Sequence, residues 1–324
     1  MNIDKLVNLL KGHKVFLQTH NFPDPDALAS AYGLQVLLRR YGIDTTICYE
    51  GKIEKVTSKR MLTVFGITAV EKNDLTDMTQ DDYIVTIDGQ KYNANFTDLI
   101  GNDVACIDHH PTYKECEYLY SDIRIVGACA TLIAEYFIDS GIVPDTNTAT
   151  ALLYGINMDT SSFSRGVTDL DIEMFRFLHA LADKNIINNL NSNTLELQDL
   201  KAYGAAIENV HVYDQFGFVH IPFNCNDALI AMISEFVLSL DVVEISVVYA
   251  DRSGGYKFSV RSENSSVHSG TLIKTALDGY GDGGGHFSMS GGIIPEENMS
   301  LLGDFKIEKI ESLFLTAREM LGKS

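Results

Sequence analysis

Four short groups of aspartate and histidine in the first half of the chain have the chemistry to hold metal ions. The first group is His20, Asp24 and Asp26, which directly follow the β-rich run VFLQT. Two carboxylates separated by one residue, in a turn stiffened by Pro23 and Pro25, can point toward one region. Open α/β sheets collect ligand groups at the carboxyl ends of their strands. One Asp would be enough to cap a following helix, so the pair with a histidine favours a ligand role.

The other three groups also follow apolar runs, and we expect all four to lie at strand ends. Asp88 follows YIVTI, Asp108, His109 and His110 follow VACI, and Asp159 comes after ALLYGI. Alone, Asp88 is equally typical of a turn, and Asp159 of a helix cap. Two adjacent histidines beside an aspartate are harder to explain by packing, because a buried imidazole needs a polar partner or a metal.

Taken together, the four groups predict a metal centre rich in oxygen ligands. Carboxylates and imidazoles without a thiolate suit manganese or magnesium better than a structural zinc ion. Six ligands are enough to hold two ions, with one carboxylate bridging them. Such a pair clamps the attacking and leaving oxygens of an in-line phosphoryl displacement and lowers the pKa of the nucleophilic water.

The elements that must position these groups alternate between strand and helix. This order predicts a mostly parallel α/β sheet flanked by helices. We expect strands at 15–19, 45–48, 83–87 and 104–107, and helices at 27–40, 128–138 and 147–156. The second half restarts as a smaller mixed α/β domain. The expected boundaries are 1–185 for the first domain, 186–212 for a connecting helix and linker, and 213–324 for the second domain.

Composition excludes several classes of protein. The chain has 324 residues, 45% of them hydrophobic, and a formal net charge of −19. Such an acidic surface disfavours a protein that coats duplex nucleic acid. The first residues lack the pattern of a secretory signal, and no apolar run is long enough to span a membrane. Five cysteines without a CxxC pair fit reduced thiols, so we expect a cytoplasmic location.

The motifs around these residues resemble those of the DHH phosphoesterase family. Those of the first half are HNFPDPDALAS (20–30), TIDG (86–89), IDHHP (107–111) and MDTSSF (158–163). In the second half, FSVRS (258–262) and GDGGGHFSMSGG (281–292) look like the DHH-associated C-terminal domain. This pairing is similar to the subgroup of oligoribonucleases, cyclic-dinucleotide phosphodiesterases and 3′-phosphoadenosine phosphatases.

The resemblance implies a role for each metal-ligating residue. Two manganese ions would be bound, with magnesium or cobalt as substitutes, and a hydroxide between them would attack phosphorus in line. The implied ligands are His20 and Asp24 for one ion, Asp26, His109 and Asp159 for the other, and Asp88 as the bridge.

The resemblance also implies catalytic and substrate-binding residues. Asp108 would support His109 or orient its loop, and His110 would face the phosphate and donate the leaving-group proton. The nucleotide would be bound from the other side of an interdomain active-site cleft. The residues that would bind it are Arg261, Gly283, Gly284, Gly285 and His286. The expected substrates are short single-stranded oligonucleotides, linear or cyclic dinucleotides, or 3′-phosphoadenosine nucleotides.

The chain departs from the family pattern at a few positions, and other functions stay open. Pro25 and Ala29 stand where Gly is usual, and Met289-Ser290 replaces a small pair after the GGGH turn, which bears on substrate preference. Alternatives are a manganese pyrophosphatase-like enzyme, a processive single-strand exonuclease and a nucleotide sensor without catalysis. The first normally has a run of Arg and Lys in its second domain, and the second carries extra domains. The oligomeric state is left open, a homodimer included.

Overall fold

The computed structural model describes residues 3–53, 55–192 and 195–322. The chain divides into two compact units, Met1–Thr194 and Leu195–Ser324, and each is described by itself. Residues 186–212, where we expected a linker, contribute to both units. Helix α7 (Lys184–Asn191) packs on α3 (Val56–Phe65) and α5 (Thr146–Asp159) of the first unit. Helix α8 (Leu200–Asn209) packs on β8 (Phe216–Ile221) of the second.

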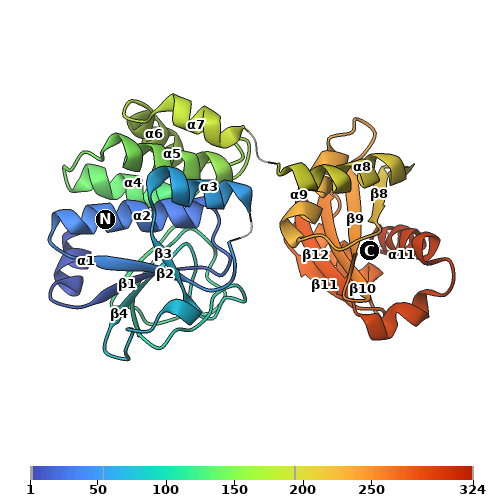
Figure 1. The fold of residues 1–324 in the computed structure, drawn as a ribbon, viewed down its shortest axis with the longest axis horizontal. Coiled ribbons are helices and arrows are strands. Elements are labelled where there is room, and N and C mark those ends of the chain that lie inside the picture. Colours follow the sequence, from blue (N-terminus) through green and yellow to red (C-terminus); the bar gives the residue numbers. More distant parts are fainter. Residues whose placement is uncertain (1–2, 54, 193–194, 323–324) are drawn as a thin grey trace. The chain divides into compact units, whose positions relative to one another are not determined.

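The first unit is built on a parallel sheet (Figure 1). In the described residues its strands follow the order β3-β2-β1-β4-β5-β6, and every neighbouring pair is parallel. Their bounds are β1 Val15–Thr19, β2 Thr45–Tyr49, β3 Ala69–Glu71, β4 Tyr83–Ile87, β5 Asn102–Asp108 and β6 Tyr120–Ile123. The order reverses direction between β1 and β4, which makes their carboxyl ends the switch point where open sheets bind ligands.

Helices cover this sheet in layers. The helices are α1 (Ile3–Leu10), α2 (Pro25–Arg40), α3 (Val56–Phe65), α4 (Cys129–Asp139), α5 (Thr146–Asp159) and α6 (Asp169–His179), with α7 beyond them. α2 and α4 lie directly on the strands, and α5 packs across both. On the other face, Phe16, Cys48, Ile84 and Leu99 form a small separate core. The expected fold class, a parallel sheet flanked by helices, is confirmed.

The strands and helices form for local reasons that the sequence carries. All five residues of β1 are buried, as expected for a central parallel strand covered on both faces. α2 starts at Pro25, two residues before the expected start at 27, because the Asp24 side chain caps it. Proline is favoured at the first position of a helix, since it has no N–H to leave unsatisfied.

The second unit contains a mixed sheet with strand order β11-β12-β10-β9-β8-β7 in the described residues. Its strands are β7 His211–Tyr213, β8 Phe216–Ile221, β9 Ile245–Arg252, β10 Gly255–Ser262, β11 Asp282–Gly285 and β12 Met289–Ile294. β8 and β9 pair parallel, and the other neighbours pair antiparallel. The expectation of a second, mixed α/β domain is therefore confirmed.

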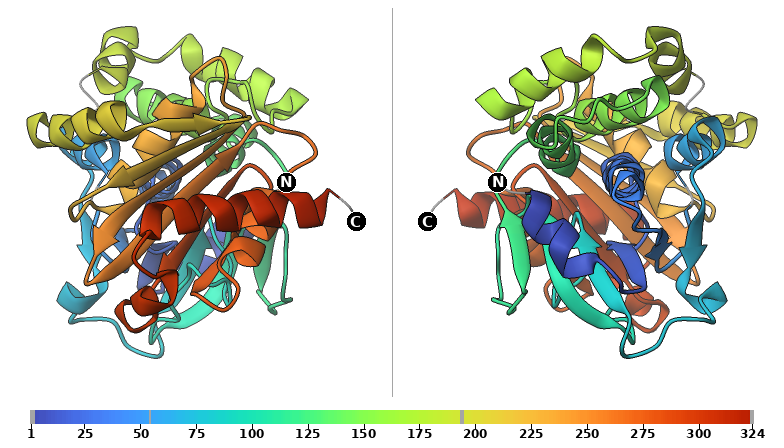
Figure 2. Two further views of the ribbon diagram at one scale, coloured as in Figure 1. Left: turned by 90° about the vertical axis from the view of Figure 1, so that its right-hand side faces the viewer. Right: turned by 90° about the vertical axis from the view of Figure 1, so that its left-hand side faces the viewer.

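Each face of the second sheet has its own core. α10 (Ser269–Ala276) and α11 (Lys306–Leu321) bury residues such as Phe314 against Phe218 and Phe258. The left-hand view of Figure 2 shows α11 crossing in front of the strands. α8 and α9 (Asp227–Leu238) cover the opposite face of β8 and β9.

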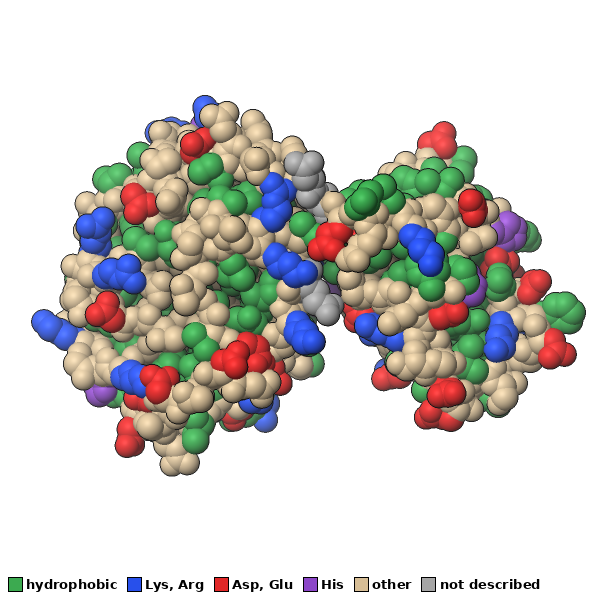
Figure 3. Space-filling view, in the orientation of Figure 1, with side chains coloured by type: hydrophobic (Ala, Val, Ile, Leu, Met, Phe, Trp, Pro, Cys, Tyr) green, Lys and Arg blue, Asp and Glu red, His purple; other side chains and the backbone are tan. Residues whose placement is uncertain are grey.

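In the described part of the chain, the face drawn in Figure 3 carries no broad patch of a single charge. On this face, Lys and Arg side chains are interspersed with Asp and Glu. Among the described residues, no helix combines the length and the apolar character that crossing a bilayer requires.

Candidate metal centre

The six expected metal ligands meet beyond the carboxyl ends of β1, β4 and β5. His20 follows β1, Asp88 follows β4, and His109 follows β5. One ligand atom from each of His20, Asp24 and Asp88 lies within 4.8 Å of the other two. Asp26, His109 and Asp159 form a second triplet on the same criterion. The fold thus gathers residues from position 20 to position 159 at the switch point of the sheet.

His20 and His109 both present their Nε2 atoms to this cluster. Their Nδ1 atoms face backbone carbonyls, of Asn21 at 2.8 Å and of Val126 at 3.0 Å respectively. A carbonyl oxygen only accepts, so each Nδ1 carries the hydrogen, and Nε2 is left as the ligand atom when the ring is neutral. This is the arrangement in which a metal-binding histidine is held by a second hydrogen bond.

Asp24 and Asp26 are oriented by helix N-termini. The Oδ1 of Asp24 accepts from the backbone N–H of Asp26 at 2.9 Å and of Ala27 at 3.1 Å. Asp24 is therefore both the helix cap and a member of the cluster, so its capping role is compatible with the expected ligand role. Asp26 accepts from Cys129 N–H at 2.7 Å and from Ala130 N–H at 2.9 Å, at the start of α4.

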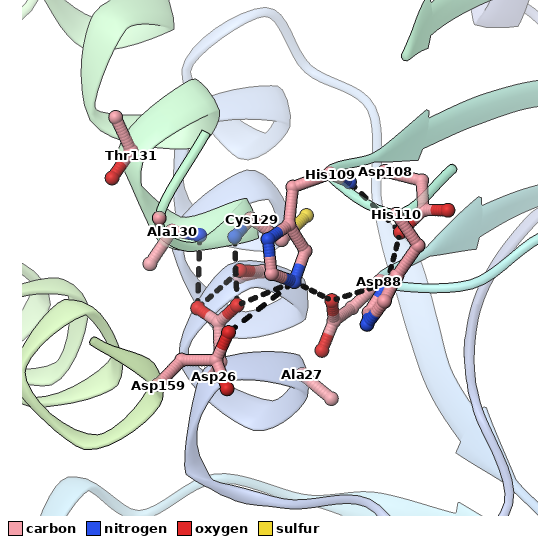
Figure 4. Close-up of polar contacts among 12 residues, drawn as sticks. Asp26, Ala27, Asp88, Asp108, His109, His110, Cys129, Ala130, Thr131 and Asp159 are labelled. Carbon is pink, nitrogen blue, oxygen red and sulfur yellow. Dashed lines mark hydrogen bonds and ion pairs between the residues drawn. The ribbon is translucent and has the colours of Figure 1, made fainter. Parts of the chain in front are cut away.

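His109 lies at the centre of the second triplet (Figure 4). Its Nε2 is 3.2 Å from Asp88 Oδ1, 3.4 Å from Asp159 Oδ2 and 3.9 Å from Asp26 Oδ2. Three carboxylates around one imidazole nitrogen make a strongly electronegative pocket. Burial opposes a charge on this ring, but the hydrogen bond and charge of Asp88 raise the pKa of His109 to about 11.

Asp88 links the two triplets. Its carboxylate is 3.6 Å from His20 Nε2 through Oδ2 and 3.2 Å from His109 Nε2 through Oδ1. The residue is buried, and its φ of +56° lies in the left-handed region, which costs a non-glycine residue energy that functional sites commonly bear. Oδ1 is buried, and the polar atoms that face it are imidazole nitrogens, His109 Nε2 at 3.2 Å and His110 Nδ1 at 3.7 Å. A buried carboxylate oxygen placed among imidazole nitrogens fits a shared cation.

The donor set as a whole fits divalent ions. Burial, and next the nearby charge of Asp88, raise the pKa of Asp26 well above its usual range. Burial also raises the pKa of Asp159. Carboxylates this crowded repel one another when ionised, and a bound cation removes that repulsion. The residues present therefore match what a hard divalent cation requires.

Asp108 holds His110 more directly than it holds His109. Asp108 Oδ1 accepts from His110 Nδ1 at 2.8 Å, whereas it contacts His109 only through that residue's backbone N–H. The ring of His109 is held by the Val126 carbonyl, which accepts from Nδ1. The two expected roles of Asp108, supporting His109 or orienting its loop, stay predictions.

Gln90 is a buried residue of this site that the sequence interpretation missed. Its Nε2 donates to Asp108 Oδ2 at 2.7 Å and to the His110 carbonyl at 3.1 Å. Gln90 is only 2% exposed. An amide directly after the TIDG motif was the available signal, but nothing in the sequence shows that its partner lies 18 residues away.

Asp159 ends a helix, not a strand. It is the last residue of α5, and three residues with positive φ, Ser161, Ser162 and Phe163, follow it in a left-handed turn. The expectation of a strand end fails here because the helical periodicity of the preceding segment extends to Asp159 itself. Arg165 folds back and donates to the Asp159 carbonyl at 2.7 Å, which places a guanidinium beside the cluster.

In the second unit, the expected substrate residues lie at one end of the sheet. Arg261 pairs with Met289 across β10 and β12, and the His286 N–H donates to the Met289 carbonyl at 2.8 Å. Gly283, Gly284 and Gly285 belong to edge strand β11, and a Cβ on Gly285 would lie 2.6 Å from the Met289 carbonyl oxygen. Met289 therefore separates Arg261 from His286.

Comparison with known families matches one domain to each of the two units. The DHH family, N-terminal domain, matches residues 14–156, and the DHHA1 domain matches residues 214–312. The chain belongs to the DHH family. The resemblance inferred from the motifs is thereby confirmed, and the DHHA1 match includes Arg261 and the glycine turn.

Individual relatives of this DHH protein differ in how much of this chain, and of their own length, the match covers. An uncharacterised protein of Methanocaldococcus jannaschii is 29% identical over 90% of this chain and 59% of its own length. A probable manganese-dependent inorganic pyrophosphatase of Streptococcus suis is 30% identical over 44% of this chain and 46% of its own. The chain thus matches only about half of the length of these curated relatives.

One solved structure resembles the chain over nearly all its length. An exopolyphosphatase-related protein from Bacteroides fragilis has a TM-score of 0.74, covering 99% of this chain and 97% of that one. Its sequence identity is 18%, so the likeness shows the fold alone.

The affinity for manganese should rise with pH. Burial opposes a charge on His20, but the hydrogen bond and charge of Asp24 raise its pKa to about 9, and the pKa of His109 is about 11. Both rings are therefore protonated at pH 7 in the metal-free protein, and a metal must displace those protons. We expect affinity to increase by about tenfold per displaced proton for each pH unit between 6 and 8.

Calorimetric titration with manganese in buffers of different ionisation enthalpy would measure both the affinity and the protons released. His13→Gln, which alters an exposed histidine of the first unit, should leave the dependence unchanged. An affinity that stays constant from pH 6 to pH 8 would contradict the assignment of the two rings as ligands.

Proposed function

We propose that this DHH protein is a manganese-dependent phosphoesterase that hydrolyses short oligonucleotides, linear or cyclic dinucleotides, or 3′-phosphoadenosine nucleotides. The observation that carries the proposal is the position of Asp88 between the triplet of His20 and Asp24 and the triplet of Asp26, His109 and Asp159. One carboxylate shared by two ligand sets is what a two-ion centre requires.

In this proposal the first unit provides the reaction centre. The six residues would hold two manganese ions, which supply Lewis acidity and lower the pKa of a water nucleophile. Asp24 and Asp26 are preoriented by backbone N–H groups, so little reorganisation is needed when the ions bind. Cys129 and Ala130 keep Asp26 aimed into the cluster by their hydrogen bonds.

His110 would deliver the proton to the leaving oxygen. Its Nδ1 donates to Asp108, which leaves Nε2 for the substrate, and its side chain is 44% exposed. Burial opposes protonation, but the hydrogen bond from His110 to Asp108 raises the pKa of His110 above its usual value. A raised pKa favours the protonated ring, which is the form that a general acid requires.

The second unit would bind the nucleotide. Arg261 offers a guanidinium to a phosphate, and the open glycine strand beside His286 lets a ligand approach the backbone closely. A Cβ on Gly284 would meet nothing within 4 Å. A pyrophosphatase needs several cations for a compact anion, whereas this strand end combines one Arg, one His and three glycines.

A parallel assay of four substrates with manganese tests the proposal. The panel is a linear dinucleotide, a pentanucleotide, 3′-phosphoadenosine 5′-phosphate and inorganic pyrophosphate. We expect turnover of at least one nucleotide and at least tenfold lower kcat/KM for pyrophosphate. Because a curated relative is named as a pyrophosphatase, faster hydrolysis of pyrophosphate would instead establish that second candidate function. Binding without turnover of all four would favour a sensor.

His286→Ala should weaken nucleotide binding and leave metal binding intact. His286 belongs to the second unit, outside both ligand triplets. We expect KM for the preferred nucleotide to rise about tenfold, while the manganese dissociation constant changes less than twofold. His211→Ala, at another exposed position of the second unit, is the matched control. An equal loss of affinity for nucleotide and for manganese would refute the proposal that the second unit binds the nucleotide and the first binds the metal.

A further inference from the structure

Phe22 is an exposed aromatic residue inside the first metal-binding motif. It lies two residues after His20 and two before Asp24, so its Cα is within about 7.6 Å of both of theirs. Phe22 is 63% exposed to solvent. Its φ is +56°, a region in which a bulky side chain is unfavourable. An exposed ring in a strained backbone contributes little to the core, and its position therefore calls for another explanation.

The surrounding chain is built to keep this ring in place. The Phe22 N–H donates to the Glu50 carbonyl at 2.8 Å. A Cβ on Gly51 would lie 2.4 Å from the Phe22 ring, so a side chain at position 51 would displace the ring from this position. One side of the ring therefore rests on the Gly51 backbone, while the residue as a whole remains largely open to solvent.

Backbone strain in this chain concentrates around the metal centre. Of the eight non-glycine residues with positive φ in the described ranges, six lie within four residues of an expected metal ligand: Phe22, Asp88, Tyr92, Ser161, Ser162 and Phe163. Strained conformations persist where the surrounding structure holds them for a function. Tyr92 is the other largely exposed aromatic of this set, but Lys114 Nζ lies 4.1 Å from its ring centre. Phe163 packs edge-on against Phe175.

We propose that the open side of the Phe22 ring stacks on a nucleobase of the substrate. This inference rests on the proposed function, since it needs a phosphate held by the neighbouring ligands His20 and Asp24. A ligand that reaches both the metal centre and this ring must combine a phosphate with a flat apolar group, as a nucleotide does and pyrophosphate does not. Stacking on an aromatic side chain tolerates any base, because every base has a π-face.

The test compares Phe22→Ala with the wild-type protein on two substrates. The first is a linear dinucleotide with both bases, and the second is the same molecule with both bases replaced by hydrogen. We expect Phe22→Ala to raise KM for the dinucleotide by about 10-fold to 100-fold, with kcat nearly unchanged. On the abasic substrate, the same substitution should have no effect.

Two further variants separate stacking from a general structural effect. Phe22→Tyr keeps a ring and should retain wild-type KM within about threefold. Leu119→Ala removes another exposed apolar side chain of the first unit, next to the amino end of β6. This variant should leave KM unchanged for both substrates. Phe22→Ala keeps a Cβ and removes a mostly exposed ring, so its unfolding temperature should stay near that of the wild type.

The outcomes distinguish the two proposals. Suppose that the wild-type protein hydrolyses the dinucleotide, but Phe22→Ala raises KM equally for the dinucleotide and the abasic substrate, or raises KM for neither. Either result overturns the stacking inference, and the phosphoesterase proposal stands. If wild-type protein with manganese hydrolyses no nucleotide of the panel, the proposed function fails and the stacking inference fails with it.

Discussion

Asp88→Asn should reduce kcat/KM with manganese by about 10³-fold or more, the largest loss of any single ligand substitution. Asp88 is the residue whose two carboxylate oxygens face both His20 and His109. Removing its charge therefore weakens both ligand sets, and metal ions of this kind contribute several kcal/mol to transition-state stabilisation. Asparagine has nearly the same shape and accepts the left-handed conformation that Asp88 adopts. The variant should therefore fold normally.

Matched substitutions make this prediction specific to the shared position. Asp24→Asn and Asp159→Asn each alter one triplet only, and we expect smaller losses from either. Calorimetry should count two manganese ions per wild-type chain and fewer in Asp88→Asn at the same metal concentration. Wild-type turnover in Asp88→Asn, or a larger loss in Asp24→Asn, would show that the bridging role is misassigned.

His110→Gln should cost about 10² to 10⁴ in kcat for a dinucleotide, the range typical of a lost general acid. The loss follows from the leaving group, because a nucleoside alkoxide needs a proton whereas p-nitrophenolate does not. We therefore expect the deficit to shrink to less than about tenfold on a p-nitrophenyl ester of a nucleotide. Measuring kcat for both leaving groups checks the role of the ring.

The residues behind His110 supply a graded control. Asp108→Asn removes the acceptor that holds Nδ1, and Gln90→Leu removes the amide that donates to Asp108. The loss of kcat for the dinucleotide should decrease in the order His110→Gln, Asp108→Asn and Gln90→Leu. The reason is that Asp108 acts through His110, and Gln90 acts through Asp108. A His110→Gln deficit of the same size for both leaving groups would rule out proton donation.

Much of this site was readable from the sequence because its signals are local. Each expected ligand lies directly after a strand, at the start of α2 or at the last residue of α5. The parallel sheet implied by the alternation of elements brings strand ends to one edge. The motifs also led to the correct family. The assignment of the six ligands and of the domain boundaries stays a prediction, although the geometry places all six residues together.

Other features depend on contacts between residues far apart in the chain, and only the folded structure decides them. No local pattern shows that α4 holds Asp26 through Cys129 and Ala130, more than 100 residues away. The same is true of Gln90, whose partner Asp108 comes from the next strand. The position of the Phe22 ring depends on the space left by Gly51, which follows the neighbouring strand β2. Residue types and spacing specify which groups are available, whereas strand order and packing determine which of them share an ion, a proton or a substrate.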